Sequence, residues 1–283
     1  MSSLNDTNSR DETIVLVTGF ANQTSWNFPH LNLYFRIRHE AYITRCTQPF
    51  RVSNPINPAW EITRNLPCNY PLYGAQETSD HSSSTQSIIQ IKAYPEPVKV
   101  AYKNVRDIVP RLWDDEKIDF VIHIGVAEER DYYSIERRAY RDGHIMPDVD
   151  GMLCADLTER HIKGVKWIWH DMPDEILSDV HIDDVCAKWK ESLPVTLQLF
   201  IYYICLCTID VRVSEDAGRY LCNFIYYSSL AQLTKNKKPK KVVFLHVPNK
   251  IDTASIEIGV TVTTQLIRAI AQMETDNKPN PTT

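Results

Sequence analysis

The stretch "KIDFVIHIGVA", residues 117–127, decides the fold class. It is a short apolar run that ends at a glycine and an alanine, which is typical of a strand buried on both faces. Three more runs of this kind are "TIVLVTGF" at 13–20, "SIIQIKAY" at 87–94 and "KKVVFLHVP" at 240–248. The four runs predict core strands of one sheet.

Segments with a helical spacing separate these strands. Between residues 95 and 112, Val98, Val105, Ile108, Val109 and Leu112 are apolar residues at helical spacing. Pro97 suits the first turn of a helix there. The stretch "GVTVTTQLIRAIAQM", 259–273, predicts a closing helix. Strands that alternate with helices indicate an α/β protein with a mostly parallel central sheet and helices on both faces.

The composition excludes several classes of protein. The chain has 283 residues with 43% apolar and 24% charged content, enough for one large α/β domain or two small ones. Its net charge of −5 gives no basic field for nucleic acid. Seven scattered cysteines without a CxxC pair favour neither a disulfide framework nor a zinc site. The polar N-terminus lacks an apolar signal core, so we expect a cytoplasmic protein with reduced thiols.

Two stretches do not fit the alternation of strands and helices. Residues 21–47 are rich in aromatic side chains and have no clean period. Residues 195–209 are strongly apolar, but they are too short for a membrane span of about 20 residues. A buried strand or helix, or weak association with a membrane surface, are the alternatives for the second stretch. The polar tails 1–12 and 274–283 are expected to be disordered.

One cysteine stands where a helix would activate it. In "SEDAGRYLCNFIYYSSL", 214–230, Gly218 permits a tight turn, and Ser214 or Asp216 would cap a helix that begins near 218–220. Cys222 then lies in the first turns, beside backbone N–H groups that have no helical partner. Such a position lowers the pKa of a thiol, and the same N–H groups would hold an oxyanion.

A cysteine nucleophile also needs a base and a group that orients it. His246 lies near the end of a predicted strand, at the carboxyl edge where α/β sheets present catalytic groups. His123 lies within a strand between two isoleucines and is expected to be a core histidine or to support the catalytic residues from behind. Glu136 belongs to the charged run 128–142, which follows another strand end. From spacing alone, Glu136 is either the orienting carboxylate or part of a solvated loop.

Several segments together resemble the pyroglutamyl peptidase I, or pyrrolidone-carboxylate peptidase, family of cysteine peptidases. The matching motifs, spread over residues 13–273, are "VLVTGF", "QPF" with "NPAWE", "VIHIGVAEER", "YSIERRA", "SEDAGRYLCNFIYYSSL" and "VVFLHVP". The resemblance implies a three-layer α/β/α sandwich and no cofactor or metal. It also implies a catalytic triad of Glu136, Cys222 and His246, which removes N-terminal pyroglutamate from peptides through a thioester.

The resemblance further implies a substrate-binding set. Phe20 and Phe50 match the aromatic residues that hold the lactam ring, although core packing is an alternative for both. Val126 and Arg130 complete the set, and Arg130 is expected near the oxyanion. The expected partners are peptides with an N-terminal pyroglutamate, with no nucleic acid and no membrane. The oligomeric state stays open.

The two unusual stretches are also the places where the resemblance breaks. Joining residue 20 to 48 restores "GFQPF", and joining 194 to 210 restores an uninterrupted approach to the nucleophile. We therefore predict that 21–47 and 195–209 are insertions in a single domain, 13–273. Glu128 and Glu129 replace small residues of the family, and their charge would raise the pKa of a nearby thiol. The alternative function is that of a catalytically impaired relative, which only binds peptides or partners.

Overall fold

The computed structural model describes residues 12–21, 56–73, 87–113, 117–193, 196–200, 203–207 and 209–276. Phe50, residues 22–47 of the first predicted insertion, and most of both predicted tails lie outside these ranges. Everything said below about the structure concerns the described residues.

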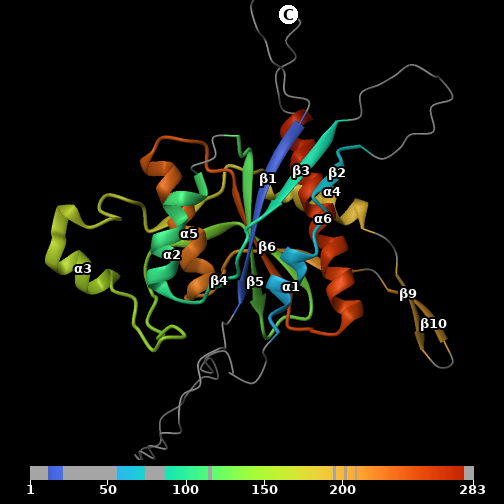
Figure 1. Cartoon of the computed structure of the whole chain (residues 1–283), viewed down its shortest axis with the longest axis horizontal. Coiled ribbons are helices and arrows are strands. Elements are labelled where there is room, and N and C mark those ends of the chain that lie inside the picture. The colour runs from blue at the N-terminus through green and yellow to red at the C-terminus, as the bar shows by residue number, and fades with distance from the viewer. Residues whose placement is uncertain are drawn as a thin grey trace, which may run out of the picture.

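Eight of the described strands form one sheet, with the order β11-β6-β12-β5-β1-β3-β2 and with β4 beside β1 (Figure 1). The strands are β1 (Glu12–Ala21), β2 (Asn69–Pro71), β3 (Ile88–Ala93), β4 (Val98–Lys99), β5 (Phe120–Ala127), β6 (Tyr133–Glu136), β11 (Val211–Ser214) and β12 (Val242–Pro248). Only β6 with β12 and β2 with β3 pair antiparallel in this sheet as described; the other pairs are parallel. The prediction of a mostly parallel sheet is confirmed.

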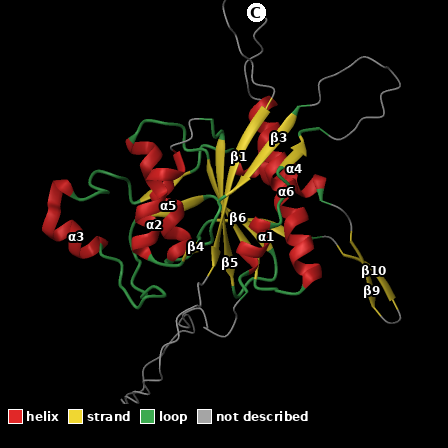
Figure 2. Cartoon of the chain, in the orientation of Figure 1, coloured by secondary structure: helices red, strands yellow, loops and turns green. Residues whose placement is uncertain are grey.

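Helices cover both faces of this sheet (Figures 1 and 2). One face carries α1 (Pro58–Arg64), α4 (Ile182–Ser192) and α6 (Thr253–Asp276), whose apolar residues share a core with the sheet. The other carries α2 (Tyr102–Ile108), the 3₁₀ helix η1 (Val109–Trp113) and α5 (Leu221–Lys235) around a second core. Because the central strands are apolar on both sides, each face needs a helical layer. The three-layer α/β/α sandwich is confirmed.

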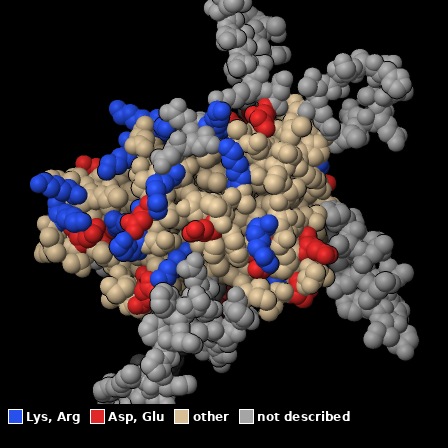
Figure 3. Space-filling model, viewed as in Figure 1, with Lys and Arg blue, Asp and Glu red and all other residues tan. Residues whose placement is uncertain are grey.

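Shorter elements lie outside these three layers. The helix α3 (Asp156–Lys163) and the 3₁₀ helix η2 (Gly164–Lys166) lie beyond α2 and α5 (Figure 1). The strands β7 (Arg138–Tyr140) and β8 (Glu175–Leu177) pair with each other, antiparallel. On the face shown in Figure 3, acidic and basic side chains are interspersed rather than gathered by sign.

The predicted helix around 95–112 begins later than its apolar spacing indicates. Val98 pairs with Phe20 at the end of β1, so the backbone before Tyr102 is extended and Pro97 does not start a helix. A tertiary pairing thus overrides the local helical spacing. The closing helix begins earlier than predicted, at Thr253, where the Asp252 carboxylate accepts bonds from the backbone N–H and the hydroxyl of Ser255.

Within the apolar stretch 195–209, the described residues 196–200 and 203–207 form strands. The strands β9 (Thr196–Phe200) and β10 (Tyr203–Cys207) pair antiparallel with each other and belong to no larger sheet of the described residues (Figure 1). No helix among the described residues has the length and apolar character of a membrane span. That this segment is an insertion stays a prediction, and it agrees with the separation of β9 and β10 from the central sheet.

Candidate active site

A tight turn precedes α5, and Cys222 is the second residue of this helix. Gly218 has a φ of +82°, which favours glycine, and its N–H donates to the Asp216 carboxylate at 2.9 Å. Tyr220 is the extended N-cap residue, without a side-chain cap bond, and the helix begins at Leu221. The predicted start near 218–220 is correct within a few residues. Asp216 stabilises the turn before the helix rather than capping the helix itself.

The thiol packs against the central strand β5. A Cβ built on Gly125 would lie 2.8 Å from Cys222 Sγ and 2.7 Å from Phe244 Cζ, so only glycine leaves room for the sulfur there. His246 is the register partner of Gly125 on the neighbouring β12. Phe244 belongs to the core beneath α5, and His246, two residues further on, lies on the same face of the sheet. Gly125 thus neighbours both residues: it faces the thiol of Cys222 and pairs with His246 on the adjacent strand.

A buried carboxylate fixes the imidazole. His246 Nδ1 lies 2.7 Å from Oε1 of Glu136, which is fully buried on β6 beside β12. Because an ionised carboxylate only accepts, Nδ1 carries the proton of this bond. A neutral ring then has Nε2 free as its basic nitrogen. Among the described residues no hydrogen bond joins His246 to the Cys222 thiol, so proton transfer requires the two side chains to approach each other.

Arg130 completes this charged group. Its Nη1 donates to Glu136 Oε1 at 2.7 Å and to Ser134 Oγ at 2.6 Å, and its Nη2 donates to the Asp216 carbonyl at 3.0 Å. Burial alone would raise the pKa of Glu136, but the hydrogen bond and charge of His246, a hydrogen bond from Ser214 and the Arg130 charge together lower it. Glu136 is therefore ionised at neutral pH. The interpretation of this residue as part of a solvated loop is wrong.

The thiol is less acidic than the helix N-terminus predicts. Burial raises the pKa of Cys222 to about 12, the Glu136 carboxylate adds to this, and Arg130 opposes it. The expectation of a lowered pKa is thus wrong, because the desolvation of the thiolate outweighs the helix N-terminus. Glu128 and Glu129 are exposed, so the charge that acts on the sulfur is Glu136 instead. At neutral pH the sulfur keeps its proton until a base removes it.

The other predicted residues have different surroundings. Phe20 is buried in the core between the sheet and α5, as the core-packing alternative expects. Val126 is buried on β5, in the core of the opposite face. His123 is a core histidine as predicted: its ring bonds the hydroxyls of Thr18 and Ser229, and burial lowers its pKa to about 3. A role in binding the lactam stays a prediction for Phe20 and Val126.

One residue of this group escaped the sequence analysis. The Tyr226 hydroxyl donates to the backbone carbonyl of Glu136 at 3.0 Å and so ties α5 to β6. Tyr226 follows Cys222 by four residues and lies on the same side of the helix. That spacing was the available signal, but the segment has many aromatic residues and nothing distinguished this one.

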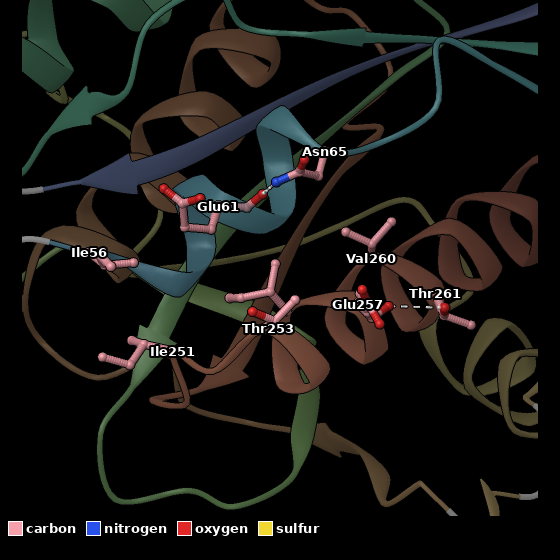
Figure 4. A pocket seen from close by; sticks show the side chains of 9 residues that line it. Ile56, Glu61, Asn65, Ile251, Thr253, Glu257, Val260 and Thr261 are labelled. Atoms are coloured by element: carbon pink, nitrogen blue, oxygen red, sulfur yellow. Dashed lines mark hydrogen bonds between the residues drawn. The ribbon is translucent and has the colours of Figure 1, made fainter.

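A hollow of about 600 Å³ lies between α1 and α6 (Figure 4). It is lined by Ile56, Glu61, Asn65, Ile251, Thr253, Ile256, Glu257, Val260 and Thr261. Of the predicted catalytic and substrate-binding residues that the structure describes, none lines this hollow. Within the described part of the chain, no group of three or more His, Cys, Asp or Glu side chains has the arrangement of a metal site.

Comparisons with known proteins agree on one family. A family model described as pyroglutamyl peptidase matches residues 170–270, which include Cys222 and His246. Pyroglutamyl-peptidase 1 of Homo sapiens is 29% identical over 160 residues, 56% of this chain and 63% of that protein. The chain thus matches less than two thirds of the length of this human relative. The pyrrolidone-carboxylate peptidase of Thermococcus onnurineus is 26% identical over 194 residues, 68% of this chain and 76% of that protein.

Solved structures show the same fold. The pyrrolidone carboxyl peptidase from Thermococcus litoralis aligns with a TM-score of 0.58 at 17% identity, over 96% of this chain and 99% of that one. The enzyme from Pyrococcus furiosus aligns with a TM-score of 0.57 at 20% identity, over 92% of this chain and 99% of that one. The resemblance expected from the sequence motifs is confirmed.

Proposed function

We propose, because the chain resembles the pyroglutamyl peptidase family, that it is a cysteine peptidase removing N-terminal pyroglutamate from peptides. The observation that carries the proposal is the 2.7 Å bond between Glu136 and His246, formed where the helix of Cys222 meets the sheet. A buried, oriented imidazole and a thiol at a helix N-terminus, both next to Gly125, supply the groups that acyl transfer needs. The comparisons supply the class of substrate.

In the proposed mechanism, His246 first acts as a general base. Its Nε2 takes the thiol proton as Cys222 Sγ attacks the pyroglutamyl carbonyl carbon, and a tetrahedral intermediate forms. Because burial raises the pKa of the thiol to about 12, proton removal accompanies the attack rather than preceding it. The carbon–nitrogen bond then breaks, His246 protonates the leaving amine, and a thioester remains.

Water completes the cycle. It attacks the thioester carbonyl while His246 takes one of its protons, the carbon–sulfur bond breaks, and the sulfur regains a proton. Free pyroglutamate leaves. Glu136 holds the imidazole in the required tautomer and stabilises the imidazolium that forms in both half-reactions.

The backbone N–H groups at the start of α5 can stabilise the negative charge that develops on the carbonyl oxygen of the substrate. The first N–H groups of the helix lack helical partners, and Tyr220 contributes no side-chain cap to them. We assign the oxyanion to these groups. Arg130, expected at the oxyanion, has its guanidinium engaged by Glu136, Ser134 and the Asp216 carbonyl instead, so we assign it to holding Glu136.

A lactam ring is uncharged and largely apolar, so an apolar slot with a few backbone hydrogen bonds suits it. We propose Phe20, Phe50 and Val126 for that slot, as the resemblance implies. We also propose action in the cytoplasm, in agreement with the free thiols of Cys68, Cys154, Cys186 and Cys222. A reducing compartment would keep the nucleophile active.

Hydrolysis of a fluorogenic pyroglutamyl amide tests the proposal. We expect turnover by the unaltered protein, and loss of at least about 10³-fold in Cys222→Ala, because the residual rate lacks covalent catalysis. Cys68→Ala, which removes an exposed free thiol, is the matched control and should leave the rate unchanged. Equal turnover in Cys222→Ala contradicts the proposal. No turnover in the unaltered protein would favour the impaired relative that only binds peptides.

A further inference from the structure

Asn223, the residue after the nucleophile, carries contacts that the proposed mechanism does not use. Its side chain is fully buried. The side-chain Oδ1 accepts from the backbone N–H of Tyr140 at 2.8 Å, and Nδ2 donates to the carbonyl of the same residue at 2.6 Å. The carboxamide therefore pairs with Tyr140, at the end of β7, as a neighbouring strand would.

His144 defines which way the amide points. Asn223 Nδ2 lies 2.8 Å from His144 Nε2, and burial lowers the pKa of this histidine to about 4. A neutral ring with an unprotonated Nε2 accepts the second amide proton, while the reverse amide orientation would place an acceptor against the Tyr140 carbonyl. The three bonds are satisfied together in one orientation only.

Tyr140 is also contacted by Arg219, a residue that precedes Cys222 in the sequence, whereas Asn223 follows it. The Arg219 guanidinium lies 3.9 Å from the centroid of the Tyr140 ring, and Arg219 also pairs with Asp216 in the turn. Cys222 thus lies between two residues, Arg219 and Asn223, that both fasten the start of α5 to Tyr140. Of these two attachments, only that of Asn223 is fully buried and bonds to backbone groups. It therefore restricts the position of the start of α5 more tightly than Arg219 does.

We propose that Asn223 is a positioning residue that fastens the first turn of α5 to β7 and so sets the thiol of Cys222 within reach of His246. The proposal rests on the function proposed above. The start of α5 has no side-chain cap, so this amide anchors it from inside the helix, through its bonds to Tyr140. A misplacement of about 1 Å at a reacting atom costs on the order of 10²-fold in rate.

The first test removes the amide. Asn223→Ala should lower kcat for the fluorogenic amide by about 10- to 100-fold and leave KM within about threefold, because the thiol moves while the lactam slot stays. Thr234→Val is the matched control: it removes a side-chain bond to the Leu230 carbonyl at the far end of the same helix. This control should keep the unaltered kcat.

The rate of alkylation of the Cys222 thiol measures the effect of Asn223 on the thiol without any substrate. Mass spectrometry after a neutral haloacetamide gives the rate at Cys222 relative to exposed Cys68 in the same molecule. If Asn223 positions the thiol beside its base, Asn223→Ala slows this relative rate at neutral pH. An unchanged rate, or faster alkylation at every pH, shows that the amide only packs the core and overturns the proposal.

Asn223→Asp keeps the size of the side chain and provides a second variant if the alanine variant fails to fold. A protonated carboxyl has one acceptor and one donor for Tyr140, whereas an ionised one meets the Tyr140 carbonyl with a negative charge. Its rate relative to the unaltered protein should rise as the pH falls from about 8.5 to about 5.5, because burial keeps a carboxyl protonated there. A pH-independent ratio would contradict the positioning role.

These readouts separate the two proposals. If the unaltered protein does not hydrolyse the pyroglutamyl amide, the proposed function fails, but the alkylation ratio still tests whether Asn223 places the thiol beside His246. If hydrolysis is present and both Asn223 variants match the Thr234→Val control in kcat and alkylation, only the positioning role fails.

Discussion

At the scale of single residues, the account depends on one buried carboxylate and its two cationic neighbours. Glu136 is desolvated, and His246, Ser214 and Arg130 keep its pKa low. Arg130→Met removes one of these neighbours, so the pKa of Glu136 rises. A carboxyl is charged only above its pKa, and the acid limb of kcat/KM should therefore move to higher pH, with a loss of about 10-fold or more at neutral pH.

The pH profile of Arg130→Met is the measurement, with Arg212→Met as its control. Arg212 is an exposed arginine that pairs with Asp210 near the start of β11 and does not contact the triad. An acid limb of Arg130→Met that coincides with that of the control would show that Arg130 does not tune Glu136.

At the scale of elements, the approach of α5 to β5 sets the place of the sulfur. In Gly125→Ala the new methyl group would lie 2.8 Å from Cys222 Sγ and 2.7 Å from Phe244, closer than atoms in contact allow. The helix or the thiol must shift, and we expect kcat to fall by about 10²-fold and stability by about 1–3 kcal/mol. Urea unfolding and steady-state kinetics measure the two effects.

Gly259→Ala is the control for Gly125→Ala, because it crowds the packing between two helices and not the Cys222 thiol. Its Cβ would lie 2.4 Å from Ile62 Cδ1, where α6 packs on α1. This control should lose a similar stability and keep its kcat. Equal losses of kcat in both variants would mean that the rate follows stability, and not the place of Cys222.

At the scale of the whole molecule, two buried histidines make the fold sensitive to acid. Burial lowers the pKa of His123 to about 3 and of His144 to about 4. Their unfolded values near 6.5 mean that the unfolded chain binds more protons below that pH. Stability is therefore full above about pH 6.5 and falls with decreasing pH, by about 1.4 kcal/mol per pH unit for each histidine, until the folded pKa is reached.

His123→Asn tests this dependence, because it removes the titrating group between Thr18 and Ser229. The difference between its unfolding free energy and that of the unaltered protein should change by about 1.4 kcal/mol per pH unit between pH 6 and pH 4. Parallel curves over that range would show that His123 is not buried as a neutral ring.

The sequence predicted those parts of the fold that depend on long apolar runs. The four runs form β1, β3, β5 and β12. Of these, β1, β5 and β12 are buried along almost their whole length, and such continuous apolar runs can be recognised without knowing the neighbouring strands. The short β6 was missed, since its four residues stand within a charged run and become buried only through their neighbours. The strand β4 was missed because its pairing with β1 is not local.

For the candidate site too, the sequence predicted some features and could not predict others. The positions of Cys222 and His246 follow from their motifs, but the raised pKa of the thiol depends on how closely α5 packs on β5, which no sequence pattern states. The two predicted insertions stay predictions. Deletion of residues 195–209 tests the second, and a retained circular dichroism spectrum with retained hydrolysis is the expected result.

The most direct test of the account is to trap the acyl group. The protein is mixed with an aryl ester of pyroglutamate, quenched in acid, digested and examined by mass spectrometry. We expect one added pyroglutamyl group on the peptide that carries Cys222, and greatly reduced labelling of that peptide in His246→Ala. Hydrolysis of the ester with no adduct on Cys222, or with the adduct on another residue, would contradict the assignment of this sulfur as the nucleophile.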